Sequence, residues 1–558
     1  MSRLRSMVFA VGGSAGASLS RGMLSAGGLA GASHSRGLPS IAGRGGSRLA
    51  SAGFLFLALC NCGIAQDLDA TAAARVLEQA LVDCIADAER SVAAIARIER
   101  PPGASPPVRI LDPFALPGGD GGENPRSRNF IPDHFGSGMI VADDQSPDER
   151  YVLTTYHVAY GENRPSEDGG GAERNVKVFV RLAGGEVIEA SAEPKAADWR
   201  SDLAVLRLDL EAAGVDPADV VPIEFGSGED LKKGRLVVVL GNPYAQARDG
   251  SASASMGMIS NTSRRPMPPD DARGLLSDDA SIHHFGTLLQ IDSRLNLGTS
   301  GGLVVNLDGE AIGLTTSLAA LRGYESSVGY AIPFDEEMLK LIADLIAGYE
   351  LEYGFLGIHP RTVGQNEATW DREEYPQATA VRVAELAGQS PAEEAGLERR
   401  DIILSINGRE VVDDIDLMRQ IGLLGPDAEA ELTVWREREE AIVRLRARLG
   451  KWPVYDDTKL VITATRYPEW RGIQVDYPTA RKKYMPSDPL SVYRRAVVVT
   501  SVAEGSPADE AGLRVGDFIE AVQGAHVERP AEFHAASADE AGPLTLKLLD
   551  GSRKTVGP

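Results

Sequence analysis

The sequence of 558 residues predicts a mainly β protein, in which one large all-β domain is followed by two copies of a smaller module. From Phe135 to Pro333, short apolar segments alternate with turns rich in Gly, Asn and Asp, the pattern of a β-barrel or β-sandwich. Residues 390–411 (SPAEEAGLERRDIILSINGREV) and 506–527 (SPADEAGLRVGDFIEAVQGAHV) match at a constant offset of 116 residues. Because 11 of these 22 positions are identical, the second half of the chain contains an internal repeat.

The N-terminal residues have the composition of a targeting segment. Residues 1–48 are rich in Gly, Ser and Ala, carry several Arg and contain no acidic residue. The apolar run Leu49–Ala65 then predicts an export signal that is cleaved near Ala65, with Met23 as an alternative start. An uncleaved anchor is the alternative, since about 17 apolar residues is the lower limit for crossing a bilayer. We therefore expect residues 1–65 to be a signal peptide or membrane anchor, and membrane association only without cleavage.

Local patterns predict further elements at the edges of the all-β domain. Residues 69–90 alternate apolar and polar side chains with helical period, and residues 91–98 have the pattern of a first strand. Residues 101–133 hold many Pro and Gly residues, which predicts a long surface loop. After the domain, an amphipathic pattern predicts a helix over 334–347 that is ended by Gly348.

Composition and motifs exclude several function classes. The net charge of −23 gives no reason to expect binding to nucleic acid, and 25% charged with 43% hydrophobic residues is ordinary for a soluble protein. The sequence has no phosphate-binding loop of the Walker type and no Cys/His spacing typical of a metal site. Neither a cofactor nor a metal is predicted.

Ser300 is a candidate nucleophile because it lies among glycines in Gly298-Thr-Ser-Gly-Gly302, where backbone N–H groups can approach a substrate carbonyl. The same residues fit the G-x-S-x-G elbow of α/β-hydrolases, which requires a helix directly after the serine and a histidine later in the chain. Residues 303–307 and 311–315 instead have the pattern of two strands, and Asp308-Gly309 between them is a strong hairpin signal. The hairpin argues against the elbow.

A serine needs a base and a group that orients the base. His157 lies at the end of the β-branched and aromatic run Tyr151–Val158, and Asp202 opens the apolar strand pattern 202–208. The order His, Asp, Ser is that of chymotrypsin, and it differs from that of subtilisin and the α/β-hydrolases.

Six motifs occur in the same order as in the HtrA (Deg) serine proteases, which the chain resembles from about residue 70 to about residue 550. They are Gly136-Ser-Gly138, Thr155-Tyr-His157-Val158, Ser201-Asp202-Leu-Ala-Val205, Gly241-Asn-Pro243, Asn296-Leu-Gly298-Thr-Ser300-Gly-Gly302 and Gly329-Tyr-Ala-Ile-Pro333. The resemblance implies a chymotrypsin-like double six-stranded β-barrel protease domain followed by two PDZ (α+β) domains. Its expected limits are 66–348 for a trypsin-like domain with an N-terminal helix, 349–450 for the first PDZ domain and 460–556 for the second, with a linker over 451–467 that has some strand character.

The expected site contains a triad of His157, Asp202 and Ser300, with an oxyanion hole formed by the N–H groups of Gly298 and Ser300. The pocket that receives the substrate side chain before the cleaved bond, S1, is expected to be lined by Arg294, Asn296, Val328, Tyr330 and Ala331. Residues 296–298 and 328–331, which are small or apolar, favour a small aliphatic side chain if Arg294 points to solvent. If Arg294 points into the pocket, an acidic side chain is the alternative.

PDZ domains add a peptide strand to a sheet edge and hold its C-terminal carboxylate in a backbone nest. The residues expected in the two nests are Phe355, Leu356, Gly357 and Ile358 in the first copy, and Gly472 and Ile473 in a poorer match in the second. Peptide binding there, together with a gating insertion over 263–285, is the expected regulation.

The resemblance implies an exported, periplasmic or otherwise extracytoplasmic, ATP-independent serine endopeptidase. It would act on unfolded or misfolded proteins and bind peptide C-termini, as a homotrimer or larger homo-oligomer. A chaperone or PDZ scaffold that binds such chains without cutting them is the alternative.

Overall fold

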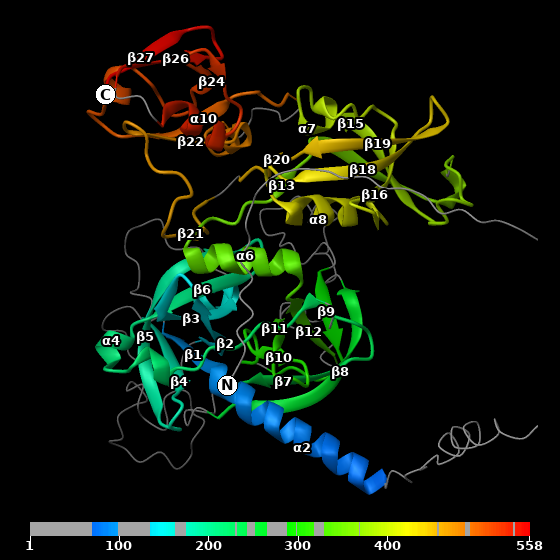
Figure 1. The fold of residues 1–558 in the computed structure, drawn as a ribbon, viewed down its shortest axis with the longest axis vertical. Coiled ribbons are helices and arrows are strands. Elements are labelled where there is room, and N and C mark those ends of the chain that lie inside the picture. The colour runs from blue at the N-terminus through cyan, green and yellow to red at the C-terminus, as the bar shows by residue number, and fades with distance from the viewer. Residues whose placement is uncertain are drawn as a thin grey trace, which may run out of the picture. The chain divides into compact units, whose positions relative to one another are not determined.

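The computed structural model describes residues 70–98, 134–161, 175–228, 231–242, 251–264, 287–296, 298–316, 328–367, 369–454, 457–485, 492–538 and 542–558 (Figure 1). The predicted signal or anchor segment 1–65, the loop 101–133 and most of the insertion 263–285 lie outside these ranges. Within these ranges, no helix combines the length and the apolar character needed to cross a bilayer.

The first barrel is a closed sheet of six strands. Its order is β5-β4-β1-β2-β3-β6, and pairing between β5 and β6 closes it. Its interior is filled by apolar side chains such as Ile95, Ile140, Val178 and Leu206, all at most 1% exposed. The strands are β1 (Val92–Ile98), β2 (His134–Asp143), β3 (Ser146–Thr155), β4 (Asn175–Arg181), β5 (Val187–Asp198) and β6 (Leu203–Leu208).

The second barrel also closes with six strands, in the order β10-β11-β12-β9-β8-β7. The hairpin predicted after Ser300 is confirmed, because β10 pairs antiparallel with β11 across the turn that contains Asp308 and Gly309. The strands are β7 (Leu236–Gly241), β8 (Ser253–Arg264), β9 (Leu288–Ile291), β10 (Leu303–Val305), β11 (Ala311–Thr316) and β12 (Gly329–Pro333).

Two helices pack on the apolar cluster shared by both barrels. The predicted N-terminal helix is α2 (Ala70–Ala88), which buries Cys84 in this cluster. The predicted helix after the barrels is α6 (Glu336–Ala347), which begins where the Asp335 carboxylate accepts the N–H of Met338 and ends at the left-handed Gly348. Shorter helices are α3 (Tyr156–Tyr160) and α4 (Leu210–Ala213), with 3₁₀ turns η1 (Glu89–Ser91) and η2 (Pro217–Asp219).

The internal repeat folds into two similar modules, each with a five-strand path of antiparallel pairs and a short strand beside it (Figure 1). The first comprises β14 (Ile358–Val363), η6 (Gln365–Glu367), β15 (Ala380–Leu386), α7 (Pro391–Glu394), β16 (Ile402–Ile406), β17 (Arg409–Glu410), α8 (Asp414–Leu424), β18 (Glu429–Arg436) and β19 (Ala441–Arg448). The second comprises β22 (Ile473–Asp476), η7 (Pro478–Lys483), β23 (Val497–Val502), α9 (Pro507–Glu510), β24 (Phe518–Val522), β25 (Ala525–His526), α10 (Pro530–Ser537), β26 (Leu544–Leu548) and β27 (Arg553–Val556). The repeated serines Ser390 and Ser506 cap α7 and α9, so the sequence match has a structural cause.

The predicted strand character of the linker is also confirmed. β21 (Val461–Ile462) pairs antiparallel with β5 and so extends the sheet of the first barrel by one strand. Thr463 and Ala464 then donate their N–H groups to the carbonyl of Gly348 at the end of α6. Before the linker, β20 (Gly450–Lys451) pairs with β13 (Gly354–Phe355). The connection between the modules is therefore hydrogen-bonded to the barrel domain.

Candidate active site

His157 and Asp202 come together because β3, which ends just before His157, pairs with β6, which begins just after Asp202. β3 and β6 pair antiparallel with Thr155 opposite Leu203, so the end of β3 and the start of β6 lie at the same rim of the barrel. The Nδ1 atom of His157 lies 3.0 Å from both carboxylate oxygens of Asp202. Because an ionised carboxylate only accepts hydrogen bonds, this pair places the proton on Nδ1 and leaves Nε2 as an acceptor.

Asp202 is held in place by several contacts. Its Oδ1 accepts the backbone N–H of His157 at 3.1 Å, and its Oδ2 accepts the hydroxyl of Thr316 at 3.3 Å. The residue is only 4% exposed, and its φ of 52° lies in the left-handed region that few non-glycine residues adopt. A costly backbone conformation persists where the surroundings enforce it, so the carboxylate has a fixed orientation.

Ser300 lies in a tight, buried turn just before β10. Gly298 and Gly301 on either side have φ of 93° and 81°. A Cβ atom added at Gly301 would lie 2.0 Å from the carbonyl oxygen of Ser137, so only glycine fits there. Ser300 itself is 3% exposed.

Helix α3, which contains His157, and the turn that contains Ser300 meet at β2. A Cβ atom added at Gly136 would lie 2.5 Å from Cγ1 of Val158 and 3.1 Å from the carbonyl oxygen of Ser300. The N–H of Ser137 donates to that same carbonyl at 2.8 Å. The structure thus brings together the segments of His157, Asp202 and Ser300 at the junction of the two barrels.

The residues expected around S1 lie in different environments. Arg294 and Asn296 are exposed, Val328 and Tyr330 are partly buried, and Ala331 is completely buried in the core of the second barrel. Among the described ranges of the chain, no group of three or more His, Cys, Asp or Glu side chains is arranged to hold a metal ion.

The carboxylate loops expected in the two modules have matching backbone hydrogen bonds. In the first module, Ala387 N–H donates to Gly357 O at 2.9 Å and Ala392 N–H donates to Leu356 O at 2.9 Å. In the second, Ala503 N–H donates to Gly472 O at 2.7 Å and Ala508 N–H donates to Arg471 O at 3.2 Å. Phe355, Leu356 and Ile473 are buried, and Ile358 is partly buried. The loops precede the edge strands β14 and β22, where an added peptide strand would pair.

The loop of the second module contains a further pair of backbone hydrogen bonds. Ile473 exchanges two backbone hydrogen bonds of 2.9 Å with Trp470, so its N–H is already used. The Trp470 ring packs edge-on against Phe533, with ring centroids 5.4 Å apart. The first loop is packed as well, because the Phe355 ring stacks on Tyr493 and lies edge-on to Trp452.

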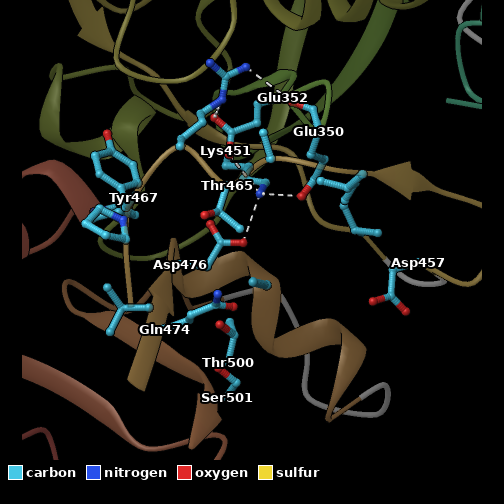
Figure 2. A pocket seen from close by; sticks show the side chains of 18 of the residues that line it. Glu350, Glu352, Lys451, Asp457, Thr465, Tyr467, Gln474, Asp476, Thr500 and Ser501 are labelled. Atoms are coloured by element: carbon cyan, nitrogen blue, oxygen red, sulfur yellow. Dashed lines mark hydrogen bonds and ion pairs between the residues drawn. The ribbon is translucent and has the colours of Figure 1, made fainter. Parts of the chain in front are cut away.

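A cavity of about 350 Å³ lies beside β22 and α10, and residues 464–468, at the end of the linker, also line it (Figure 2). At one side of this cavity, Lys451 lies between three acidic residues from two segments, as Figure 2 shows. Its Nζ atom is 2.9 Å from Asp476, 3.0 Å from Glu352 and 3.2 Å from Glu350. Burial lowers the pKa of this ammonium group, but attraction by the three carboxylates outweighs burial and holds the pKa well above 10.5. Sequence reasoning assigned Lys451 only to the linker, because an isolated Lys in a sequence does not indicate its partners.

Replacing Lys451 by Met is expected to destabilise the protein by about 3–5 kcal/mol, the usual cost of leaving buried charges without their partner. Met has a similar length, so the loss comes from the three carboxylates that then face one another. Lys451→Arg keeps the charge and serves as the matched control. Urea unfolding at neutral pH measures both variants, and equal stability of Lys451→Met and wild type would contradict the prediction.

Asp476 provides a pH test of the same cluster. Burial raises the pKa of its carboxyl group from 3.8 to about 6, even though Lys451 acts in the opposite direction. The folded state therefore binds this proton more tightly than the unfolded chain. This group's contribution to stability is present at low pH and is lost as the pH rises from about 3.8 to about 6. We expect the difference in unfolding free energy between wild type and Asp476→Asn to change across this pH window. A difference that stays constant would contradict the raised pKa of Asp476.

Comparison with known proteins agrees with this architecture. A trypsin-like peptidase domain matches residues 136–314, and PDZ domains match residues 354–446 and 498–549. A probable periplasmic serine endoprotease, DegP-like, of Chlamydia trachomatis is 27% identical over 439 residues, which cover 78% of this chain and 76% of the relative. The periplasmic serine endoprotease DegP of Salmonella typhimurium is 24% identical over 440 residues, covering 79% and 78%. The solved structure of HtrA-type protease AlgW with tripeptide is 22% identical and covers 67% of this chain and 97% of that chain, with a TM-score of 0.43.

Proposed function

The chain is a trypsin-like serine endopeptidase with two PDZ domains, and from this premise we propose that His157, Asp202 and Ser300 are its catalytic triad. His157 Nε2 takes the proton of the Ser300 hydroxyl while the serine oxygen attacks a peptide carbonyl. Asp202 keeps the imidazole in the required tautomer and stabilises the imidazolium that forms. The observation that carries the proposal is the 3.0 Å contact of Nδ1 with the Asp202 carboxylate, because it leaves Nε2 as the base.

The second half of the reaction uses the same groups. The N–H groups of Gly298 and Ser300 are proposed to hold the negatively charged oxygen of the tetrahedral intermediate. The imidazolium of His157 then gives its proton to the leaving amine, which releases one product and leaves an acyl group on Ser300. Water, activated by His157, hydrolyses that ester. The reaction consumes no nucleotide, which is consistent with ATP-independent cleavage.

We further propose that the substrates are unfolded or misfolded proteins in an extracytoplasmic compartment. The two named relatives are described as periplasmic endoproteases. An extended chain is required both for the cleft of such a protease and for pairing with the edge strands β14 and β22. The exposure of Arg294 supports a preference for a small aliphatic side chain at S1. Peptide C-termini are proposed to bind mainly to the first PDZ domain, because the N–H of Ile473 in the second is already bonded to the carbonyl of Trp470.

Cleavage of one protein in two forms tests the function. The chain without residues 1–65 is incubated with a disulfide-bonded protein in its native state and with the same protein after reduction and alkylation. We expect rapid cleavage of the unfolded form, at sites after small aliphatic residues, and little cleavage of the native form. Equal cleavage of both forms would contradict selection of unfolded chains.

A pair of peptides tests the proposed regulation in the same assay. A peptide with an apolar, free C-terminus is expected to accelerate cleavage, because the backbone nest recognises a carboxylate. The same peptide with an amidated C-terminus is the matched control and should have little effect. If both peptides act alike, the carboxylate loops are not the regulatory site.

A further inference from the structure

Ser137 is a fully buried serine in β2 of the first barrel, and its hydroxyl and backbone N–H bind loop residues of the second barrel. Its Oγ donates to the carbonyl of Gly298 at 2.8 Å and accepts the N–H of Asn242 at 2.8 Å. Its backbone N–H donates to the carbonyl of Ser300, also at 2.8 Å. One residue therefore binds the carbonyls of both residues whose N–H groups form the proposed oxyanion hole.

These bonds restrain the turn at the places where it is most free to rotate. The peptide plane between Gly298 and Thr299 is held at both edges, because Ser137 Oγ binds its carbonyl and Asn296 O accepts its N–H at 3.1 Å. The plane between Ser300 and Gly301 is held in the same way, by Ser137 N–H and by the carbonyl of Thr315 at 2.8 Å. The N–H of Gly298 belongs to the preceding peptide plane, and Gly298 has no side chain to limit rotation at its Cα, so anchoring of the following plane limits the directions that this N–H can take.

Ser137 itself is rigidly placed. It pairs with Ala94 of β1, and its carbonyl accepts the hydroxyl of Thr154 in β3 at 2.7 Å. Hydrogen bonds to a strand of one barrel thus determine the position of the catalytic turn of the other. Preorganised donors are effective because they need no rearrangement when charge develops on the substrate oxygen.

We propose that Ser137 is a positioning residue that holds the oxyanion hole in its reactive geometry. The inference rests on the function proposed above and assigns Ser137 a role in kcat, beyond stability. Ser137→Ala removes the hydroxyl and frees the carbonyl of Gly298 and the N–H of Asn242 from their partner. We expect kcat to fall about 10–100-fold with little change in KM, less than the 10²–10³-fold loss typical of deleting an oxyanion donor outright.

The test compares Ser137→Ala with Ser537→Ala, using a short peptide substrate. Ser537 is also buried, and among the residues that the structure describes its hydroxyl bonds the carbonyls of Phe533 and His534 in its own helix. A second readout is the affinity of a peptide trifluoromethyl ketone, whose oxygen occupies the oxyanion hole after Ser300 adds to it. We expect Ser137→Ala to weaken this inhibitor by about the factor by which kcat/KM falls, as for any transition-state analogue.

A lowered melting temperature with wild-type kcat and inhibitor affinity in folded Ser137→Ala would overturn the inference. If that variant does not fold, Ser137→Cys retains the side-chain size with a weak donor and is measured in the same way, with wild-type values again overturning the inference. Failure of the proposed function has a different signature, since wild type itself would then be inactive or Ser300→Ala would remain active.

Discussion

Replacing Ser300 by Ala is expected to lower kcat about 10⁶-fold, the loss seen when the nucleophile of a serine protease triad is removed. Without the hydroxyl no acyl-enzyme can form, and only unassisted attack of water on the bound peptide remains. The turn should keep its shape, because the conformations of its glycines and its backbone hydrogen bonds do not depend on the side chain of Ser300. Single-turnover cleavage of a chromogenic peptide measures the change, and circular dichroism verifies the fold.

The same variant separates the endopeptidase from a purely binding protein. Ser300→Ala should still bind unfolded chains and peptide C-termini, since the edge strands β14 and β22 are unchanged. A Ser300→Ala protein that cleaves at the wild-type rate would show that another residue is the nucleophile. Loss of peptide binding along with cleavage would instead show that the substitution disturbs more than the chemistry.

Replacing Asp202 by Asn is expected to lower kcat about 10⁴-fold at neutral pH. An amide in the position of the carboxylate can donate to Nδ1 of His157, which favours the tautomer with the proton on Nε2. His157 then cannot accept the proton of Ser300. The imidazolium formed during the reaction also loses its neighbouring negative charge, which adds to the barrier.

Thr316→Val is the matched control for this prediction. It removes the hydroxyl that donates to Asp202 Oδ2 at 3.3 Å but leaves the carboxylate and the imidazole in place. Its effect on kcat should be far smaller than that of Asp202→Asn. Steady-state kinetics from pH 6 to pH 9 measure both variants, and a similar loss in both would assign the effect to displacement of Asp202 rather than to its charge.

The elements that the sequence predicted are determined by residues that are close together along the chain. The hairpin after Ser300 follows from Asp308-Gly309 between two apolar runs, and α6 follows from its amphipathic period and the stop at Gly348. The two PDZ modules follow from a repeat that places the same capping serine before the same short helix. His157, Asp202 and Ser300 were found as candidates because each lies in a local pattern and because their order along the chain is restrictive.

Tertiary structure alone decided which distant groups meet. Ser137 binds Gly298 across 161 residues of sequence, and Lys451 binds Glu350 across 101 residues. No short pattern marks either contact, because a hydroxyl or an ammonium group acquires its partners only when separate strands pack together. By itself the sequence determined an all-β domain, the repeated modules and the three candidate catalytic residues. The fold decided how the catalytic turn is anchored and how the linker is held, since both depend on burial and on hydrogen bonds between segments far apart in the chain.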